Sequence, residues 1–189
     1  MLFSGDKRKI SFYVRELLSD EPLILDTETT GLGYDDEVLE LCIIDCDSSV
    51  LFESYFNPHN CSVDDGAYRV HGLSSKYLSQ FPVIDDYYDD VNSLLFNRSV
   101  IIYNSGFDVR LLRQSFREEI SFFNTSFFCA MEICSAYFGA TNRHGTRSLV
   151  NSVRAAGIDF RGRPHTAKAD CFATLDCLQW IADQNKPVG

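Results

Sequence analysis

Basic residues are scarce in this sequence, in which 17 Lys and Arg stand against 27 Asp and Glu and leave a net charge of −10 over 189 residues. A protein that grips nucleic acid along a broad face needs many basic residues to neutralise phosphates, so the composition argues against that mode of binding. A small site that contacts phosphate through bound cations stays possible, because carboxylates to hold such ions are abundant.

Long apolar runs and paired cysteines are missing as well. No segment reaches the roughly 18 apolar residues of a membrane span, and the N-terminus lacks the apolar core of a signal peptide. The seven cysteines are scattered and include no CxxC pair or Cys/His cluster with zinc-site spacing. Free thiols are typical of a reducing compartment, so we expect a cytoplasmic protein without a membrane partner.

What the chain does contain is the composition of a folded domain. Hydrophobic residues make up 45% and aromatic residues 13% of the sequence, which excludes disorder as the dominant state. The length suggests one domain, and apolar periodicity predicts short strands followed by strand–helix alternation. Strands are expected at 23–26, 38–44, 50–56 and 99–103, and helices at 6–18, 83–96, 107–116, 130–138, 147–156 and 166–183. This order is typical of an α/β domain with a mixed sheet.

Two acids follow the first apolar strand. Asp26 and Glu28 lie two residues apart, so their side chains leave the same face of the strand, and Thr29-Thr30-Gly31 ends it. One acid here could simply cap a turn. Two unpaired acids at the end of a buried strand are costly unless a cation is present, so the pair favours a metal site.

Asp108 and Asp170, each considered alone, are weaker evidence for a functional site. Asp108 lies just behind the strand at 99–103, at the start of a helix, where the helix dipole by itself favours an acid. Asp170 lies in the last expected helix, five residues after His165, and an isolated helical Asp is usually solvated. Their spacing becomes informative only together with the first pair.

Together, three segments resemble the motifs of the DEDDh, or DnaQ-like, 3′–5′ exonucleases, which include the proofreading subunit of bacterial DNA polymerase III. The segments are LILDTETTGL, IIYNSGFD and HTAKAD, in the family's order and approximate spacing, and YRVHGL resembles the element between the first two motifs. The resemblance spans about residues 23–181. It implies a ribonuclease H-like α/β fold with a mixed sheet flanked by helices, an exonuclease domain over 21–185 and an N-terminal helical extension over 1–20.

The resemblance also implies roles for the acids and the histidine. Asp26, Glu28, Asp108 and Asp170 match the acids that hold two divalent cations, Mg²⁺ or Mn²⁺, in a two-metal-ion mechanism. Asp26 is expected to bridge both ions. His165 resembles the general base, a role that suits an ordinary imidazole pKa near 6.5. Its place in a loop would let it move over bound substrate.

Contacts with substrate follow from the same resemblance. The matching residues are Thr29, Thr30, Leu32, His71, Asn104 and Phe107, although core packing explains Leu32 and Phe107 equally well. Arginines between 143 and 163 gather before the third motif, and they fit either a phosphate-binding rim or ordinary surface charge. The acids of the run at 85–90 are expected to form a solvated helix face.

The resemblance predicts a metal-dependent exonuclease that removes nucleoside 5′-monophosphates from single-stranded 3′ ends, with DNA favoured over RNA. Alternatives are an exoribonuclease that trims RNA, a phosphodiesterase acting on small nucleotides, and a non-catalytic nucleic-acid-binding accessory subunit. A polymerase or another replication or repair protein is the expected protein partner. The helix at 6–18 either docks on such a partner or packs on the sheet, and packing is favoured.

Overall fold

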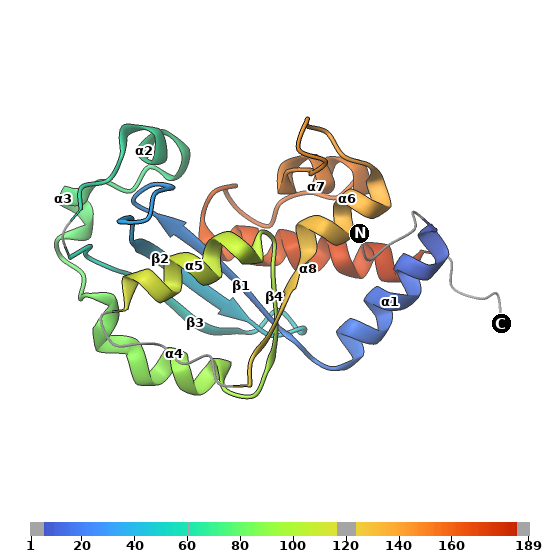
Figure 1. The fold of residues 1–189 in the computed structure, drawn as a ribbon, viewed down its shortest axis with the longest axis horizontal. Coiled ribbons are helices and arrows are strands. Elements are labelled where there is room, and N and C mark those ends of the chain that lie inside the picture. Colours follow the sequence, from blue (N-terminus) through green and yellow to red (C-terminus); the bar gives the residue numbers. More distant parts are fainter. Residues whose placement is uncertain (1–5, 60, 117–123, 185–189) are drawn as a thin grey trace.

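The fold is a five-stranded mixed sheet with helices on both faces (Figure 1), seen in a computed structural model that describes residues 6–59, 61–116 and 124–184. The strands are β1 (Leu23–Thr29), β2 (Val38–Ile44), β3 (Val50–Tyr55), β4 (Ser99–Ile102) and β5 (Ser126–Cys129). Their spatial order is β3-β2-β1-β4-β5. The first three strands form an antiparallel meander, and β4 and β5 run parallel to β1.

The helices divide between the two faces of the sheet. They are α1 (Lys7–Ser19), α2 (Asp65–His71), α3 (Ser75–Leu78), the 3₁₀ helix η1 (Ile84–Tyr87), α4 (Tyr88–Leu95), α5 (Ser105–Ser115), α6 (Ala130–Phe138), α7 (Leu149–Ala156) and α8 (Ala167–Asp183). One apolar core joins one face of the central strands to α1, α6, α7 and α8, and a second joins the other face to η1, α4 and α5. The central strands are continuous apolar runs because both of their faces are covered.

Helix α1 belongs to the first of these cores. Ile10, Val14 and Leu17 recur at helical spacing and are buried against α8 and α6. The Arg15 guanidinium donates to the carbonyl of Ala182 at 2.6 Å, so α1 also caps the end of α8. The helix therefore packs on the domain, mainly against α8 and α6, within the core that also covers one face of the sheet.

The expected strands and long helices are confirmed within a few residues, and three parts of the chain differ. The segment after residue 57, expected to be irregular up to Gly72, contains α2, which buries only His71 and so shows no apolar periodicity; the short helix α3 follows it. The helix expected at 83–96 is divided into η1 and α4. Strand β5 was not predicted, because its four residues run directly into α6.

The packing of α1 on the domain can be tested by mutation. Leu17→Ala removes a side chain that is only 5% exposed, and we expect it to lower the free energy of unfolding by about 2–5 kcal/mol. Phe12→Ala on the exposed face of the same helix is the control and should change stability by less than about 0.5 kcal/mol. Chemical denaturation measures both. Equal, small effects would mean that α1 contributes little to the folded domain.

Candidate active site

Asp26 and Glu28 are placed by the register of the sheet. Within β1 they point to the face that α8 covers, and they lie opposite Cys42 and Glu40 of β2. The pairing of β1 with β4 stops at Leu25 and Ile102, one residue before Asp26. The flank of β1 is therefore open at Asp26, beside the junction between β4 and α5.

Asp108 comes from that junction. It lies in the first turn of α5, its side chain is 4% exposed, and its Oδ1 accepts a hydrogen bond of 2.8 Å from the Thr27 hydroxyl. Thr27 points to the opposite face of β1 from its neighbours Asp26 and Glu28. The hydroxyl thus fixes Asp108 at the side of the strand end.

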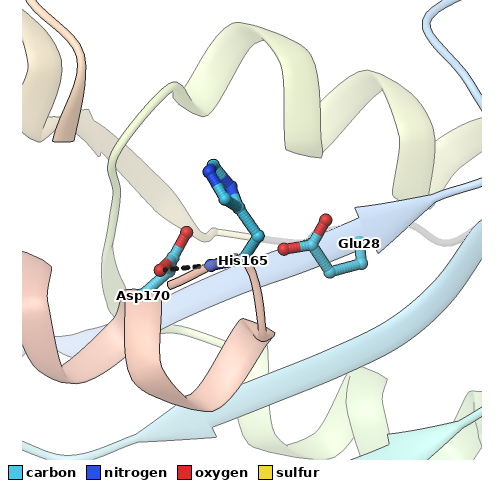
Figure 2. Close-up of side chains that lie close together, drawn as sticks. All are labelled: Glu28, His165 and Asp170. Atoms are coloured by element: carbon cyan, nitrogen blue, oxygen red, sulfur yellow. Dashed lines mark hydrogen bonds between the residues drawn. The ribbon is translucent and has the colours of Figure 1, made fainter. Parts of the chain in front are cut away.

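Asp170 and His165 come from the start of α8. Thr166 caps this helix by accepting from the Ala169 amide, and the loop before it places His165 at a φ of 63°, a left-handed conformation that is uncommon outside glycine. The His165 amide donates to Asp170 Oδ1 at 3.2 Å. One ligand atom each from Glu28, His165 and Asp170 lie within 4.8 Å of one another, and Figure 2 shows the imidazole beside the two carboxylates.

Burial raises the pKa of each of these four acids, and repulsion from neighbouring carboxylates adds to the rise at Asp26, Glu28 and Asp108. Burial, followed by repulsion from Asp108 and Asp170, raises the pKa of Asp26 well above its ordinary value. Burial and the same kind of repulsion, chiefly from Asp170, raise the pKa of Glu28 to about 8. Burial raises the pKa of Asp108 to about 7 against the opposing hydrogen bond from Thr27. Burial also raises the pKa of Asp170. The hydrogen bond from the His165 amide and the charge of the His165 side chain lower this pKa and partly offset the rise.

Such a cluster has the chemistry of a divalent cation site. Carboxylates crowded together in a desolvated place need opposing charge to be ionised at neutral pH. The Arg163 guanidinium lowers the pKa of the Glu28 carboxyl, but by less than burial raises it. Because the donors are oxygens with one imidazole, the residues fit a hard dication such as Mg²⁺ or Mn²⁺.

Glu40 is an acid of this site that the sequence did not identify. It is 1% exposed, faces Glu28 across the β1–β2 ladder and lies opposite Tyr55 of β3. Hydrogen bonds from the Ala167 amide and the Tyr55 hydroxyl lower its pKa, yet burial dominates and raises it to about 7. Glu40 thereby ties β2 to the first turn of α8, the helix that carries Asp170. In the sequence, the feature that could have identified Glu40 is that it is the single charged residue within the apolar run VLELCII.

A pocket of about 430 Å³ opens beside the acids. Its walls come from the end of β1, the loop after it, α2 and α5, and include Thr29, Leu32, His71 and Phe107. Four of the six residues expected to contact substrate therefore line one cavity together with Glu28. Leu32 is 79% exposed, so it is not a core residue.

Thr30 and Asn104 are placed differently. Thr30 is fully buried; its hydroxyl donates to Asp36 Oδ1 at 2.6 Å and accepts from the Glu37 amide at 2.9 Å, which fixes the loop after β1. Asn104 is exposed at the start of α5 and is not among the residues that line the pocket.

His71 supports the pocket wall as a neutral imidazole. Its Nδ1 accepts from the Leu73 amide at 3.0 Å, which leaves the proton on Nε2 to be donated to the Thr29 carbonyl at 3.2 Å. Burial lowers the pKa of His71, and the nearby Arg163 and His165 lower it further. The ring therefore holds α2 against the end of β1.

The arginines near the third motif are largely engaged with the protein itself. Arg161 pairs with Asp176, and Arg147 donates to the carbonyls of Phe138, Gly139 and Asn151. Arg163 is exposed and donates to the Val70 carbonyl at 3.5 Å, close to the site. Arg163 is thus the member of this group that acts on the Glu28 carboxylate, whereas Arg147 and Arg161 bind to other parts of the protein surface.

The family of the chain follows from comparison with known proteins. Residues 23–178 match the RNase T exonuclease family. The exonuclease CP81 of Escherichia phage 186 is 30% identical over 183 residues, covering 92% of this chain and 94% of the phage protein. The epsilon subunit of DNA polymerase III from Buchnera aphidicola is 27% identical over 159 residues, covering 79% of this chain but only 59% of that protein.

Solved structures agree with the fold. Exonuclease I of E. coli, in complex with a dT13 oligonucleotide, superposes with a TM-score of 0.67 at 19% identity, covering 87% of this chain and 41% of that one. The chain belongs to the RNase T exonuclease family. It is a DnaQ-like 3′–5′ exonuclease, which confirms the expected family, fold and class of enzyme. Members of this family depend on divalent metal. Within its described residues, the chain has no helix of the length and apolarity that a bilayer crossing requires.

The raised pKa values predict how stability depends on pH. The pKa of Glu28 is about 8 in the folded chain against an ordinary 4.5, so the folded chain holds its proton more tightly than the unfolded chain does. The free energy of unfolding without metal should therefore fall as the pH rises from about 4.5 to about 8. Added Mg²⁺ or Mn²⁺ binds the ionised acids, so it should raise Tm more near pH 8 than near pH 4.5.

Thermal denaturation with EDTA or with either cation measures both effects. Glu28→Gln removes one of the titrating acids and should flatten the dependence on pH. The exposed Asp89→Asn on α4 is the control and should leave it unchanged. A Tm that ignores both cations near pH 8 would contradict a metal site at these acids.

Proposed function

We propose that the chain removes nucleotides from the 3′ end of single-stranded nucleic acid, with DNA favoured over RNA, and releases nucleoside 5′-monophosphates. The observation that carries this proposal is the placement of desolvated acids and an exposed imidazole beside a half-open, partly apolar pocket. The acids suit cations that face a phosphodiester, and the pocket suits a terminal nucleoside. The oligonucleotide in the Exonuclease I complex supports single-stranded DNA as the substrate.

In this proposal Asp26, Glu28, Asp108 and Asp170 would hold two divalent cations, Mg²⁺ or Mn²⁺. When bound, these cations would assist ionisation of the attacking water and stabilise the charge on the leaving oxygen. Thr27 fixes Asp108, and the His165 amide fixes Asp170, so two of the four acids are oriented before any ion arrives. Glu40 would orient the start of α8 rather than contact an ion.

His165 would act as the general base. The residue is exposed, and its imidazole lies close to the carboxylates of Glu28 and Asp170, where a water held at these acids would be within its reach. The backbone of His165 is left-handed, in the loop before α8, and its imidazole lies beside the carboxylates of Glu28 and Asp170. A proton taken from water at this ring can then pass to solvent.

The pocket would receive the terminal nucleoside. Leu32 and Phe107 offer apolar surface for the base, and Thr29 lies at the end of β1 next to the acids. His71 supports this wall, Thr30 shapes the loop that carries Leu32, and Asn104 would meet the strand at the rim of α5. A nucleobase that leaves a duplex must unstack, so an apolar pocket of this kind favours single strands.

The remaining alternatives differ in substrate or partner. Trimming of RNA, or cleavage of small nucleotides, would use the same acids. A non-catalytic accessory subunit is disfavoured, because all four acids and the histidine are present. A polymerase partner is supported only by relatives that are subunits of DNA polymerase III, of which this chain spans 59% in the Buchnera protein. A cytoplasmic location, and the division into a 1–20 extension and a 21–185 domain, stay predictions.

The test is hydrolysis of labelled single-stranded DNA, RNA and dinucleotides with Mg²⁺ or Mn²⁺. Asp26→Asn keeps the size of the side chain but removes its charge, and should reduce turnover to background on every substrate. Asp89→Asn is the matched control and should retain activity. Full hydrolysis by Asp26→Asn would exclude the proposed mechanism, and the substrate hydrolysed fastest decides among DNA, RNA and small nucleotides.

His165 is tested separately. His165→Ala should lower kcat by roughly 10²–10⁴-fold at saturating metal, which is the usual contribution of a general base. The exposed His144→Ala is its control. Unchanged turnover in His165→Ala would remove this residue from the mechanism.

A further inference from the structure

The loop between β1 and β2 holds an aromatic ring in solvent close to the pocket. Tyr34 is 85% exposed and lies two residues beyond Leu32, which lines the pocket and is itself 79% exposed. Single exposed aromatics are common on protein surfaces. This one differs because a cation from another element lies over its ring.

That cation is Arg110 of α5. Its guanidinium carbon lies 5.0 Å from the centre of the Tyr34 ring and 5.4 Å from the centre of the Phe107 ring. Phe107 lines the pocket, so Arg110 links the pocket wall to the exposed tyrosine. The three groups form a continuous strip, which we call the Tyr34–Arg110 platform, of two aromatic rings with one guanidinium between them.

Several hydrogen bonds fix the loop that carries the platform. Arg110 donates to the carbonyls of Gly33 at 2.6 Å and of Leu32 at 3.1 Å, and Gln114 donates to the carbonyls of Gly33 and Asp36. The Asp36 carboxylate accepts from the Gly33 amide at 2.6 Å. Two side chains of α5 thus clamp the loop from one side and one carboxylate ties it from within, so a ligand would find the ring already in place.

The positive charge of Arg110 is also available. Its hydrogen-bond partners are backbone carbonyls and the Gln114 amide oxygen, and across the described part of the chain it forms no ion pair with a carboxylate. It also lines a second hollow, of about 580 Å³, along the outer side of α5, with Arg113 among the other lining residues. The described residues that line this hollow include these two arginines and no carboxylate, whereas Asp35 and Asp36 follow Tyr34 in the adjoining loop.

We propose that the Tyr34–Arg110 platform is a second nucleotide subsite, which binds a base upstream of the 3′-terminal nucleotide by stacking on Tyr34 while Arg110 attracts the phosphate between them. The inference rests on the proposed function, because it presupposes a strand whose end lies in the pocket. Stacking on an aromatic ring is tolerant of sequence and needs a base that is not already stacked in a duplex. The platform would therefore select single strands at least two nucleotides long.

Substrates that lack one base test this subsite. A series of DNA oligonucleotides carries a single abasic position at the second, third, fourth or fifth nucleotide from the 3′ end, and kcat/KM for the first cleavage is measured by single-turnover quench. We expect one of these positions to lower kcat/KM of the wild-type enzyme roughly 5- to 150-fold, as loss of one base–aromatic stack predicts. In Tyr34→Ala that sensitivity should disappear, whereas Tyr34→Phe should keep it.

Phe12→Ala on α1 removes another exposed aromatic ring, on an element outside the loop, and it should show the wild-type pattern. A wild-type enzyme that is indifferent to all four abasic positions overturns the subsite, and so does a Tyr34→Ala variant that keeps the wild-type sensitivity. The wild-type series alone can refute the proposal, whatever the stability of Tyr34→Ala. The p-nitrophenyl ester of thymidine 5′-monophosphate has no upstream nucleotide, so its hydrolysis tests the proposed function separately.

Discussion

Repulsion among buried carboxylates is the constraint around which this chain is built. Five acids are buried close together, and each has a pKa above its ordinary value. They are Asp26, Glu28, Glu40, Asp108 and Asp170. Burial of like charges opposes folding unless protons or cations compensate. Apolar strands and helices on both faces of the sheet must therefore hold the acids together against their own repulsion.

The positions of the acids show how that is achieved. Three acids lie on adjacent antiparallel strands or at a strand end, where register fixes them, and two lie in the first turns of helices, where free amides face them. The hydrogen bonds that lower their pKa values come from the same elements: Thr27 for Asp108, the Ala167 amide for Glu40 and the His165 amide for Asp170. A helix start and a strand end thus stabilise the charges that the cluster needs once a cation is bound.

Sequence alone predicts the parts of this arrangement that depend on local pattern. Apolar runs indicate the central strands, and the motifs with their spacing indicate Asp26, Glu28, Asp108, His165 and Asp170. Glu40 is different, because its importance comes from the register of β2 against β1, which no local pattern contains. Thr30 is a second example. Its position in a motif predicts contact with substrate, whereas the structure shows that its hydroxyl forms hydrogen bonds within the loop, which only the fold reveals. Contacts such as that of Arg110 with Tyr34, 76 residues apart in sequence, likewise need the fold.

The negative net charge now has a spatial meaning. Arg110, in α5, donates to the loop after β1, and Arg163, in the loop before α8, donates to the Val70 carbonyl of α2. Without cations, the acids of the site would repel a phosphodiester more strongly than these two arginines attract it, because the acids are more numerous and less solvated. Cations that neutralise the acids leave both arginines acting on the same phosphate backbone. Metal binding would thereby turn a site that rejects nucleic acid into one that accepts it, with no large basic surface required.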